Sequence, residues 1–126
     1  MKVAYVDTSC LVAIAFGEKG ATALGCRLEE FDELLSSNLL EAELRASFVR
    51  ENVEPVASYL DAIGWILPDR PLSQEMSAVL AAGYLRGVHL WHLACALYVV
   101  DRPQDMSFVT LDSGQSAVAE ALGFAT

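Results

Sequence analysis

The chain has 126 residues, a usual size for one domain, and we expect a single domain over residues 1–126. Hydrophobic residues make up 54% of it, yet no apolar run reaches the roughly 18 residues that cross a bilayer, which argues against a membrane protein. The net charge of −9 argues against a general nucleic-acid binder that works by neutralising phosphates.

The amino terminus does not have the order of a secretion signal, because Asp7, Thr8 and Ser9 precede the apolar run of residues 10–16. We therefore expect a cytoplasmic protein. Its three cysteines are too few and too scattered for a disulfide framework or a zinc knuckle, and we expect reduced, mostly buried thiols.

The first part of the chain alternates between strand and helix patterns. Residues 2–6 predict a strand that ends before Asp7, and Ser9 is placed to cap an apolar helix that stops near Gly17. Residues 21–31 predict an amphipathic helix, and residues 34–37 predict a second strand.

The alternation continues through the middle of the chain. Asn38 is placed to cap a helix that runs to about Asn52, and a further helix is predicted from Pro55 to Gly64. A brief strand follows at residues 65–67. Ser73 is then placed to cap a helix that reaches about Leu85.

After Gly87, the run HLWHLACALYVV predicts a helix packed on a sheet. Residues 106–111 predict a strand before Asp112, and residues 116–122 predict a last helix that Gly123 ends. Strands and helices alternate throughout. The fold class is therefore α/β, a three-layer α/β/α sandwich with a mainly parallel central sheet.

Two predicted strands, the first and the last, are followed by acids, Asp7 in YVD and Asp112 in VTLD. Ligands of open α/β sheets bind outside the carboxyl ends of the strands, so two acids there predict a charged pocket. Either residue alone could instead begin a loop or cap the next helix.

Glu43 interrupts an apolar stripe on the helix after Asn38, because Leu40, Leu44 and Ser47 share its face. A carboxylate in that position needs a partner or a metal ion. Glu41 lies on another face and can pair with Arg45. We therefore expect Glu43 to be the functional acid.

Hard divalent cations such as Mg²⁺ bind carboxylate oxygens and water, so Asp7, Glu43 and Asp112 are candidate metal ligands. Two such ions can support phosphodiester hydrolysis without a nucleophilic side chain. The chain contains no P-loop, GxSxG, HExxH or GxGxxG motif that would predict other chemistry.

Four blocks of the chain, in order, resemble the PIN domain family, and within it the VapC-like toxins of toxin-antitoxin modules. The family's acids fall at Asp7 in VDTSCLVAIAF, at Glu43 in SSNLLEAELRAS and at Asp112 in SFVTLDSGQSAVAEALGF. The hydroxyls of Ser9 and Thr110 match the family's pattern as secondary candidates.

The resemblance implies a PIN-like sandwich and a divalent-metal-dependent endoribonuclease that uses Mg²⁺ or Mn²⁺. It also implies an RNA substrate, a cognate antitoxin protein and a homodimer. A role as the toxin of a VapBC-type module follows from the same likeness.

The third block, RGVHLWHLACAL, departs from the family, which has Asp where this chain has His89, three residues before His92. Imidazole in place of carboxylate removes a charge and a hard oxygen, so metal affinity should fall. His89 could ligate Mn²⁺ or another borderline ion, contact phosphate when protonated, or mark a domain that has lost catalysis.

The leading hypothesis is RNA hydrolysis at Asp7, Glu43, Asp112 and His89, with Arg45 and Arg86 as secondary candidates for steering RNA. The local help that an acidic protein needs to hold RNA could come from divalent cations, from a cluster among Arg45, Arg50 and Arg86, or from a partner. The alternative is a catalytically degenerate PIN domain that binds a protein partner. A nuclease directed at DNA shares the same chemistry.

Three other residues receive structural interpretations. A zinc site made of His89 and His92 is the less favoured reading, and His92 is expected at the helix–sheet contact, satisfied by a nearby group. Trp65 and Trp91 are expected in the core or at a dimer interface.

Overall fold

A computed structural model describes residues 1–54 and 58–126 of the chain. The described residues form a four-stranded sheet in the order β3-β2-β1-β4, and each pair of neighbouring strands is parallel. This confirms the predicted α/β class with a parallel sheet. The strands are β1 Val3–Val6, β2 Glu33–Ser37, β3 Ile63–Ile66 and β4 Ser107–Val109.

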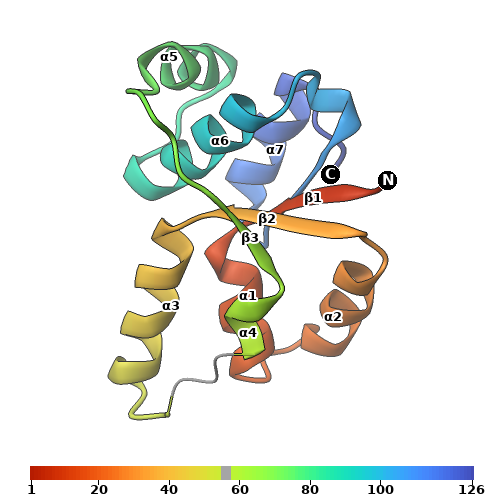
Figure 1. The fold of residues 1–126 in the computed structure, drawn as a ribbon, viewed down its shortest axis with the longest axis vertical. Helices are drawn as coiled ribbons and strands as arrows, with labels where there is room; N and C mark the ends of the chain where they lie inside the picture. The colour runs from red at the N-terminus through yellow and green to blue at the C-terminus, as the bar shows by residue number, and fades with distance from the viewer. Residues whose placement is uncertain (55–57) are drawn as a thin grey trace.

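Helices cover both faces of the sheet and complete the predicted three layers (Figure 1). One face carries α1 Thr8–Ala15, α2 Ala21–Glu29, α3 Leu39–Arg50 and the short α4 Ser58–Asp61. The other carries α5 Ser73–Ala82, α6 Gly87–Val99 and α7 Ser113–Leu122, with the 3₁₀ turn η1 Pro103–Asp105 before β4.

Strand β1 lies between two hydrophobic clusters because its side chains alternate between the two faces of the sheet. Tyr5 belongs to the cluster under α5, α6 and α7, while Ala4 and Val6 belong to the cluster under α1, α2 and α3. The ring of Tyr5 stacks on that of Phe108 in β4, with the ring centroids 5.1 Å apart. The strand that ends at Asp7 is therefore fixed by packing on both faces.

Helix α1 begins at Thr8, two residues earlier than the sequence predicts. Its N-cap is Asp7, whose carboxylate accepts a hydrogen bond from the backbone N–H of Ser9, so Ser9 is not the cap. A carboxylate accepts such a bond well, and the favourable N-terminal end of the helix dipole stabilises its charge. The first acid after β1 is thus held in place by the helix that follows it.

The helix predicted from Pro55 to Gly64 is largely wrong, although residues 55–57 lie outside the described residues. Helix α4 spans Ser58–Asp61, and Gly64 belongs to β3, where it is paired with Leu35 of β2. A Cβ at residue 64 would lie 2.9 Å from Leu35 Cδ2. Glycine therefore serves here for close strand packing, not as a helix end.

The carboxyl-terminal region also differs from the prediction. Strand β4 ends at Val109 instead of continuing to residue 111, and α7 begins at Ser113 instead of Ser116. Asp112 is the N-cap of α7, where its carboxylate accepts the N–H of Gln115 at 2.7 Å. The second strand-end acid therefore caps a helix, the alternative that its position had left open.

Helix α5 also lacks the predicted side-chain cap. Its N-cap position is Leu72, with no side-chain capping bond, and the helix ends at Ala82 instead of about residue 85. Gly83 is extended there, and a Cβ at this residue would lie 2.8 Å from Val118 Cγ2 in α7. Close contact with α7 therefore coincides with the end of α5.

Helix α3 is anchored on the sheet by Leu40 and Leu44, which are fully buried. Asn38 precedes the helix but makes no side-chain capping bond, and Ser37 Oγ instead accepts the N–H of Leu39 at 3.1 Å. The two leucines set which face of α3 points at the sheet. Glu43, beside Leu44, therefore lies at the edge of the buried face.

Cys10 and Cys95 are buried and Cys26 is exposed, and all three cysteines are free thiols. This agrees with the expectation of reduced, mostly buried thiols. Within the described parts of the chain, none of the helices has the length and apolar character needed to cross a bilayer.

Replacing Leu44 with alanine should destabilise the protein by about 3 kcal/mol, because it leaves a cavity under α3. The matched control is Arg45→Ala on the adjacent exposed position, which should change stability by less than about 1 kcal/mol. Urea unfolding followed by circular dichroism measures both. Equal effects of the two substitutions would contradict this orientation of α3.

Candidate active site

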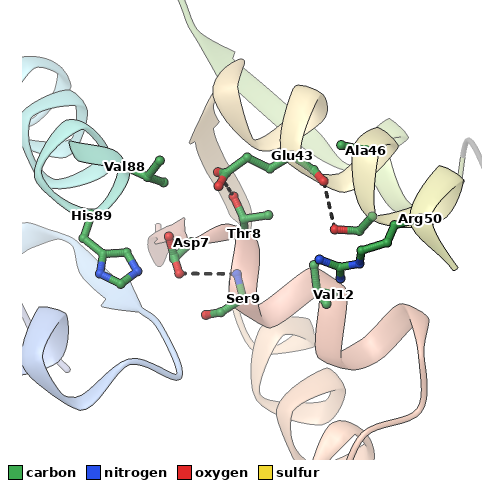
Figure 2. Close-up of a pocket in the computed structure, with 10 residues that line it drawn as sticks. Asp7, Thr8, Ser9, Val12, Glu43, Ala46, Arg50, Val88 and His89 are labelled. Atoms are coloured by element: carbon green, nitrogen blue, oxygen red, sulfur yellow. Dashed lines mark hydrogen bonds between the residues drawn. The ribbon is translucent and has the colours of Figure 1, made fainter. Parts of the chain in front are cut away.

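A pocket of about 520 Å³ opens at the carboxyl end of β1, between α1, α3 and the start of α6 (Figure 2). Strands β1 and β4 are neighbours, while β2 and β3 lie on the other side of β1. The pocket therefore lies by the point where the strand order reverses, which is the usual ligand crevice of open α/β sheets. Its lining residues are Asp7, Thr8, Ser9, Val12, Glu43, Ala46, Ser47, Arg50, Val88 and His89.

Asp7 forms the floor of this pocket and is only 2% exposed. Its Oδ2 accepts the N–H of Ser9 at 3.3 Å and lies 3.2 Å from the Thr110 hydroxyl. Its backbone N–H donates to the Val109 carbonyl at 3.0 Å, which extends the pairing of β1 and β4 by one residue. Asp7 is thus a buried carboxylate held by groups from two strands and a helix.

Glu43 reaches the same pocket from α3, and its side chain is 30% exposed. The Thr8 hydroxyl donates to its Oε1 at 2.7 Å, and His92 Nε2 lies 3.3 Å from the same oxygen. Burial alone would raise the pKa of Glu43, but the hydrogen bonds from His92 and Thr8 bring the pKa below its ordinary value. The site therefore favours an ionised carboxylate at Glu43.

His92 is completely buried in α6, as its structural interpretation requires, and its ring nitrogens contact the Tyr5 and Thr8 hydroxyls. The structure adds that Nε2 lies 3.5 Å from Asp7 Oδ1 as well as 3.3 Å from Glu43 Oε1. Asp7 and Glu43, 36 positions apart in the sequence, therefore meet at one imidazole nitrogen.

Asp112 and His89 form the opposite side of the site. His89 Nδ1 lies 3.8 Å from Asp112 Oδ2, and both side chains are 40% exposed. His89 lines the pocket, and in Figure 2 its ring lies on the side that faces Asp7, whereas Asp112 is not among the lining residues. The structure thus brings Asp7, Glu43 and His89 together, with Asp112 joined to them through His89.

The secondary candidates fall in different places. Ser9 lines the pocket, and its hydroxyl accepts the N–H of Leu111 at 3.2 Å. Thr110 contacts Asp7, and its hydroxyl donates to Gln115 Oε1 at 2.7 Å. Both hydroxyls therefore connect the pocket to the loop after β4.

Of the arginines near the site, the pocket is lined by Arg50 and not by the two secondary candidates, Arg45 and Arg86. Arg45 pairs with Glu41 at 2.6 Å, as predicted, and does not line the pocket. Arg50 lines the pocket instead, and Arg86 lies beside His89 in an adjoining hollow of about 340 Å³. Arg50 is seven positions after Glu43, so the periodicity that selects Glu43 also selects Arg50.

Sequence reasoning missed two residues that hold the site together. Thr8 donates to Glu43, and its place directly after the strand-end acid was the available signal. Gln115 is fully buried and donates from Nε2 to the backbone carbonyl of His89 at 3.2 Å. A polar residue in a predominantly polar stretch gave no comparable signal for Gln115.

Among residues 1–54 and 58–126, no group of three or more His, Cys, Asp or Glu side chains is arranged to hold a metal ion. Asp7 and Glu43 nevertheless supply two carboxylates to one pocket. Mg²⁺ commonly binds through one or two carboxylates and keeps several waters, so these donors fit a hard divalent cation.

Comparison of the chain with curated proteins and with solved structures gives no match. The family model described as PIN domain matches residues 4–121, which include most of β1, the acids described above and most of α7. With this match and its parallel α/β sandwich, the chain belongs to the PIN domain family.

Proposed function

We propose that the protein is a divalent-metal-dependent endoribonuclease that hydrolyses RNA phosphodiester bonds at this pocket. The observation that carries the proposal is the convergence of Asp7 and Glu43 beside His89 at the carboxyl end of the parallel sheet. PIN domains are generally nucleases, typically use divalent metals and bind RNA, and membership of the family points to a nuclease-type function.

Asp7 and Glu43 are the proposed ligands of a Mg²⁺ or Mn²⁺ ion, and Asp112 is the proposed third acid. Such an ion lowers the pKa of bound water and stabilises negative charge on the reacting phosphate. In the protein, Thr8 and His92 orient Glu43, while Ser9 and Thr110 orient Asp7. The carboxylates are thereby kept in fixed positions on the pocket wall.

His89 changes the chemistry of the proposed site relative to the acid that the family usually has there. Its imidazole brings no negative charge and no hard oxygen. Imidazole nitrogen suits Mn²⁺ and other borderline ions better than Mg²⁺, so we propose Mn²⁺ as the preferred ion. Its Nδ1 lies 3.8 Å from Asp112 Oδ2, so the ring stands beside the third proposed acid.

An acidic protein needs local positive charge to hold RNA, since the chain carries a net charge of −9. Arg50 lines the pocket, and Arg86 lines the hollow that shares Val88 and His89 with it. These two arginines are the proposed contacts to phosphates on either side of the scissile bond. Arg50 pairs with Glu51 at 3.2 Å and Arg45 with Glu41 at 2.6 Å, but Arg45 does not line the pocket and has the weaker case.

The biological role that we propose is the toxin of a VapBC-type toxin-antitoxin module, with a cognate antitoxin and a homodimeric state. This part rests on the likeness of the four sequence blocks to VapC-like proteins. The second candidate is a degenerate PIN domain that binds a protein partner without cleaving RNA. The specific observation in its favour is His89 in the place of an acid.

Glu43→Gln should reduce cleavage of an RNA panel at least about 100-fold, since it removes a proposed metal ligand with little change of shape. The matched control is Glu41→Gln, two positions away on the same helix and outside the pocket, which should retain native activity. Equal activity of the two variants would remove Glu43 from the proposed site. Duplex DNA in the same assay separates an RNA-directed from a DNA-directed nuclease.

Asp7→Asn should also abolish cleavage while the protein stays folded, because asparagine is as good an N-cap as aspartate. Asp32→Asn, before β2 at the other end of the sheet, removes the same charge away from the pocket and should remain active. Cleavage rates and melting temperatures of both variants check this. A melting temperature lowered in Asp7→Asn alone, with full activity retained, would assign Asp7 a purely structural role.

His89→Asp should raise Mg²⁺ affinity at least about 10-fold, because it adds a carboxylate to the site. His89→Asn removes the imidazole without adding charge, and its Mg²⁺ affinity should stay near the native value. Titration calorimetry with Mg²⁺ and Mn²⁺ measures both variants. Activity gained only in His89→Asp, with none in the native protein, would support the degenerate-domain alternative.

A further inference from the structure

Both ring nitrogens of the buried His92 have polar neighbours. Nε2 faces three oxygens, Thr8 Oγ1 at 3.2 Å, Glu43 Oε1 at 3.3 Å and Asp7 Oδ1 at 3.5 Å. Ionised carboxylates accept hydrogen bonds and do not donate them. The Thr8 hydroxyl has one proton, which it donates to Glu43. Nε2 must therefore carry a proton, because each of its neighbours is an acceptor toward it.

The other ring nitrogen, Nδ1, faces the hydroxyl of Tyr5 across the helix–sheet contact. The Tyr5 oxygen already accepts the backbone N–H of Ser37 at 3.1 Å. Burial raises the pKa of Tyr5 well above its ordinary value, so the phenol keeps its proton. A buried hydroxyl proton needs an acceptor, and Nδ1 provides one. A Tyr5 hydroxyl that donates to Nδ1 agrees with a ring proton on Nε2, where the neighbouring oxygens are acceptors.

Tyr5 is well suited to this task because its ring cannot turn away. It is completely buried, stacks on Phe108 at 5.1 Å and meets the His92 ring edge-on at 5.6 Å. Its hydroxyl position is thus set by the packing of β1 and β4. A hydroxyl held in this position keeps its hydrogen bond to Nδ1 of His92.

We propose that His92 is a positioning residue whose Nε2–H, held in place by the Tyr5 hydroxyl, keeps the carboxylates of Asp7 and Glu43 together in the pocket. The two acids come from β1 and α3, and like charges at close range repel each other. One N–H that bonds Glu43 Oε1 and lies 3.5 Å from Asp7 Oδ1 reduces this repulsion before any cation binds. The role of these contacts in metal binding rests on the proposed nuclease function, whereas the contacts of His92 with the two acids do not.

The first test needs no variant and no activity. Long-range ¹H–¹⁵N NMR spectra of the metal-free native protein distinguish the two neutral histidine tautomers. We expect His92 in the Nε2–H form alone. A dominant Nδ1–H form, or an even mixture, would overturn the proposal.

The second test removes the hydroxyl that selects the tautomer. Tyr5→Phe should give a mixture of His92 tautomers and weaken Mn²⁺ binding roughly 10-fold, as expected for loss of an outer-shell contact. Tyr98→Phe is the matched control, because Tyr98 lies on the same helix as His92 and donates to Asp69 at 3.0 Å. It should leave both the tautomer and the Mn²⁺ affinity unchanged.

The third test separates positioning from core filling. His92→Gln can place an amide N–H near the position of Nε2–H, whereas His92→Leu fills the space without a donor. We expect Mn²⁺ affinity to be higher in the glutamine variant than in the leucine variant. Equal affinities in native, glutamine and leucine forms would reduce His92 to a packing residue. If the leucine variant does not fold, the tautomer measurements still decide.

The outcomes also separate this proposal from the proposed function. A native protein that cleaves no RNA, yet keeps the Nε2–H form and loses Mn²⁺ affinity in Tyr5→Phe, would reject the nuclease and leave the positioning role in place. A native protein that cleaves RNA, with full Mn²⁺ affinity in Tyr5→Phe and His92→Leu, would support the nuclease and reject the positioning role of His92.

Discussion

A carboxylate that is almost completely buried must be surrounded by donors, and this constraint at Asp7 organises one end of the molecule. Polar groups from three elements lie around it. The N–H of Ser9 at the start of α1 donates to Oδ2, the Thr110 hydroxyl after β4 lies 3.2 Å from the same oxygen, and Nε2 of His92 in α6 lies 3.5 Å from Oδ1. Because these elements lie on both faces of the sheet, the surroundings of Asp7 connect the two helical layers. The pocket exists where these elements meet.

The parallel sheet and most helices follow from local sequence patterns. Alternating strands and helices fix the α/β class, and the helical periodicity around Leu40 and Leu44 correctly places Glu43 at the edge of a buried face. The same periodicity, carried one heptad further, reaches Arg50 at the pocket. The helical periodicity of α3 shows which face of the helix meets the sheet. It was therefore sufficient to predict Glu43, one acid of the candidate site.

The helix starts and the role of Gln115 were not predicted, because they depend on hydrogen bonds to residues that are distant in the sequence as well as on local patterns. Asp7 and Ser9 are both good N-caps, and Asp7 also contacts Thr110, 103 positions away, and His92. Helix α7 starts at Ser113 because Asp112 caps it, which a periodic pattern beginning at Ser116 could not reveal. Gln115 joins α7 to α6 through a backbone carbonyl, and a main-chain acceptor leaves no trace in sequence.

The carbonyl of His89 accepts the Gln115 amide through the main chain, so the position of residue 89 does not depend on its side chain. Different residues can be exchanged there while the first turn of α6 stays docked on α7. The backbone thus sets the position of residue 89, while its side chain sets which ions or phosphates it can contact. Evolution could therefore retune the ion preference of such a pocket, or silence it, by changing a single codon without redesigning the fold.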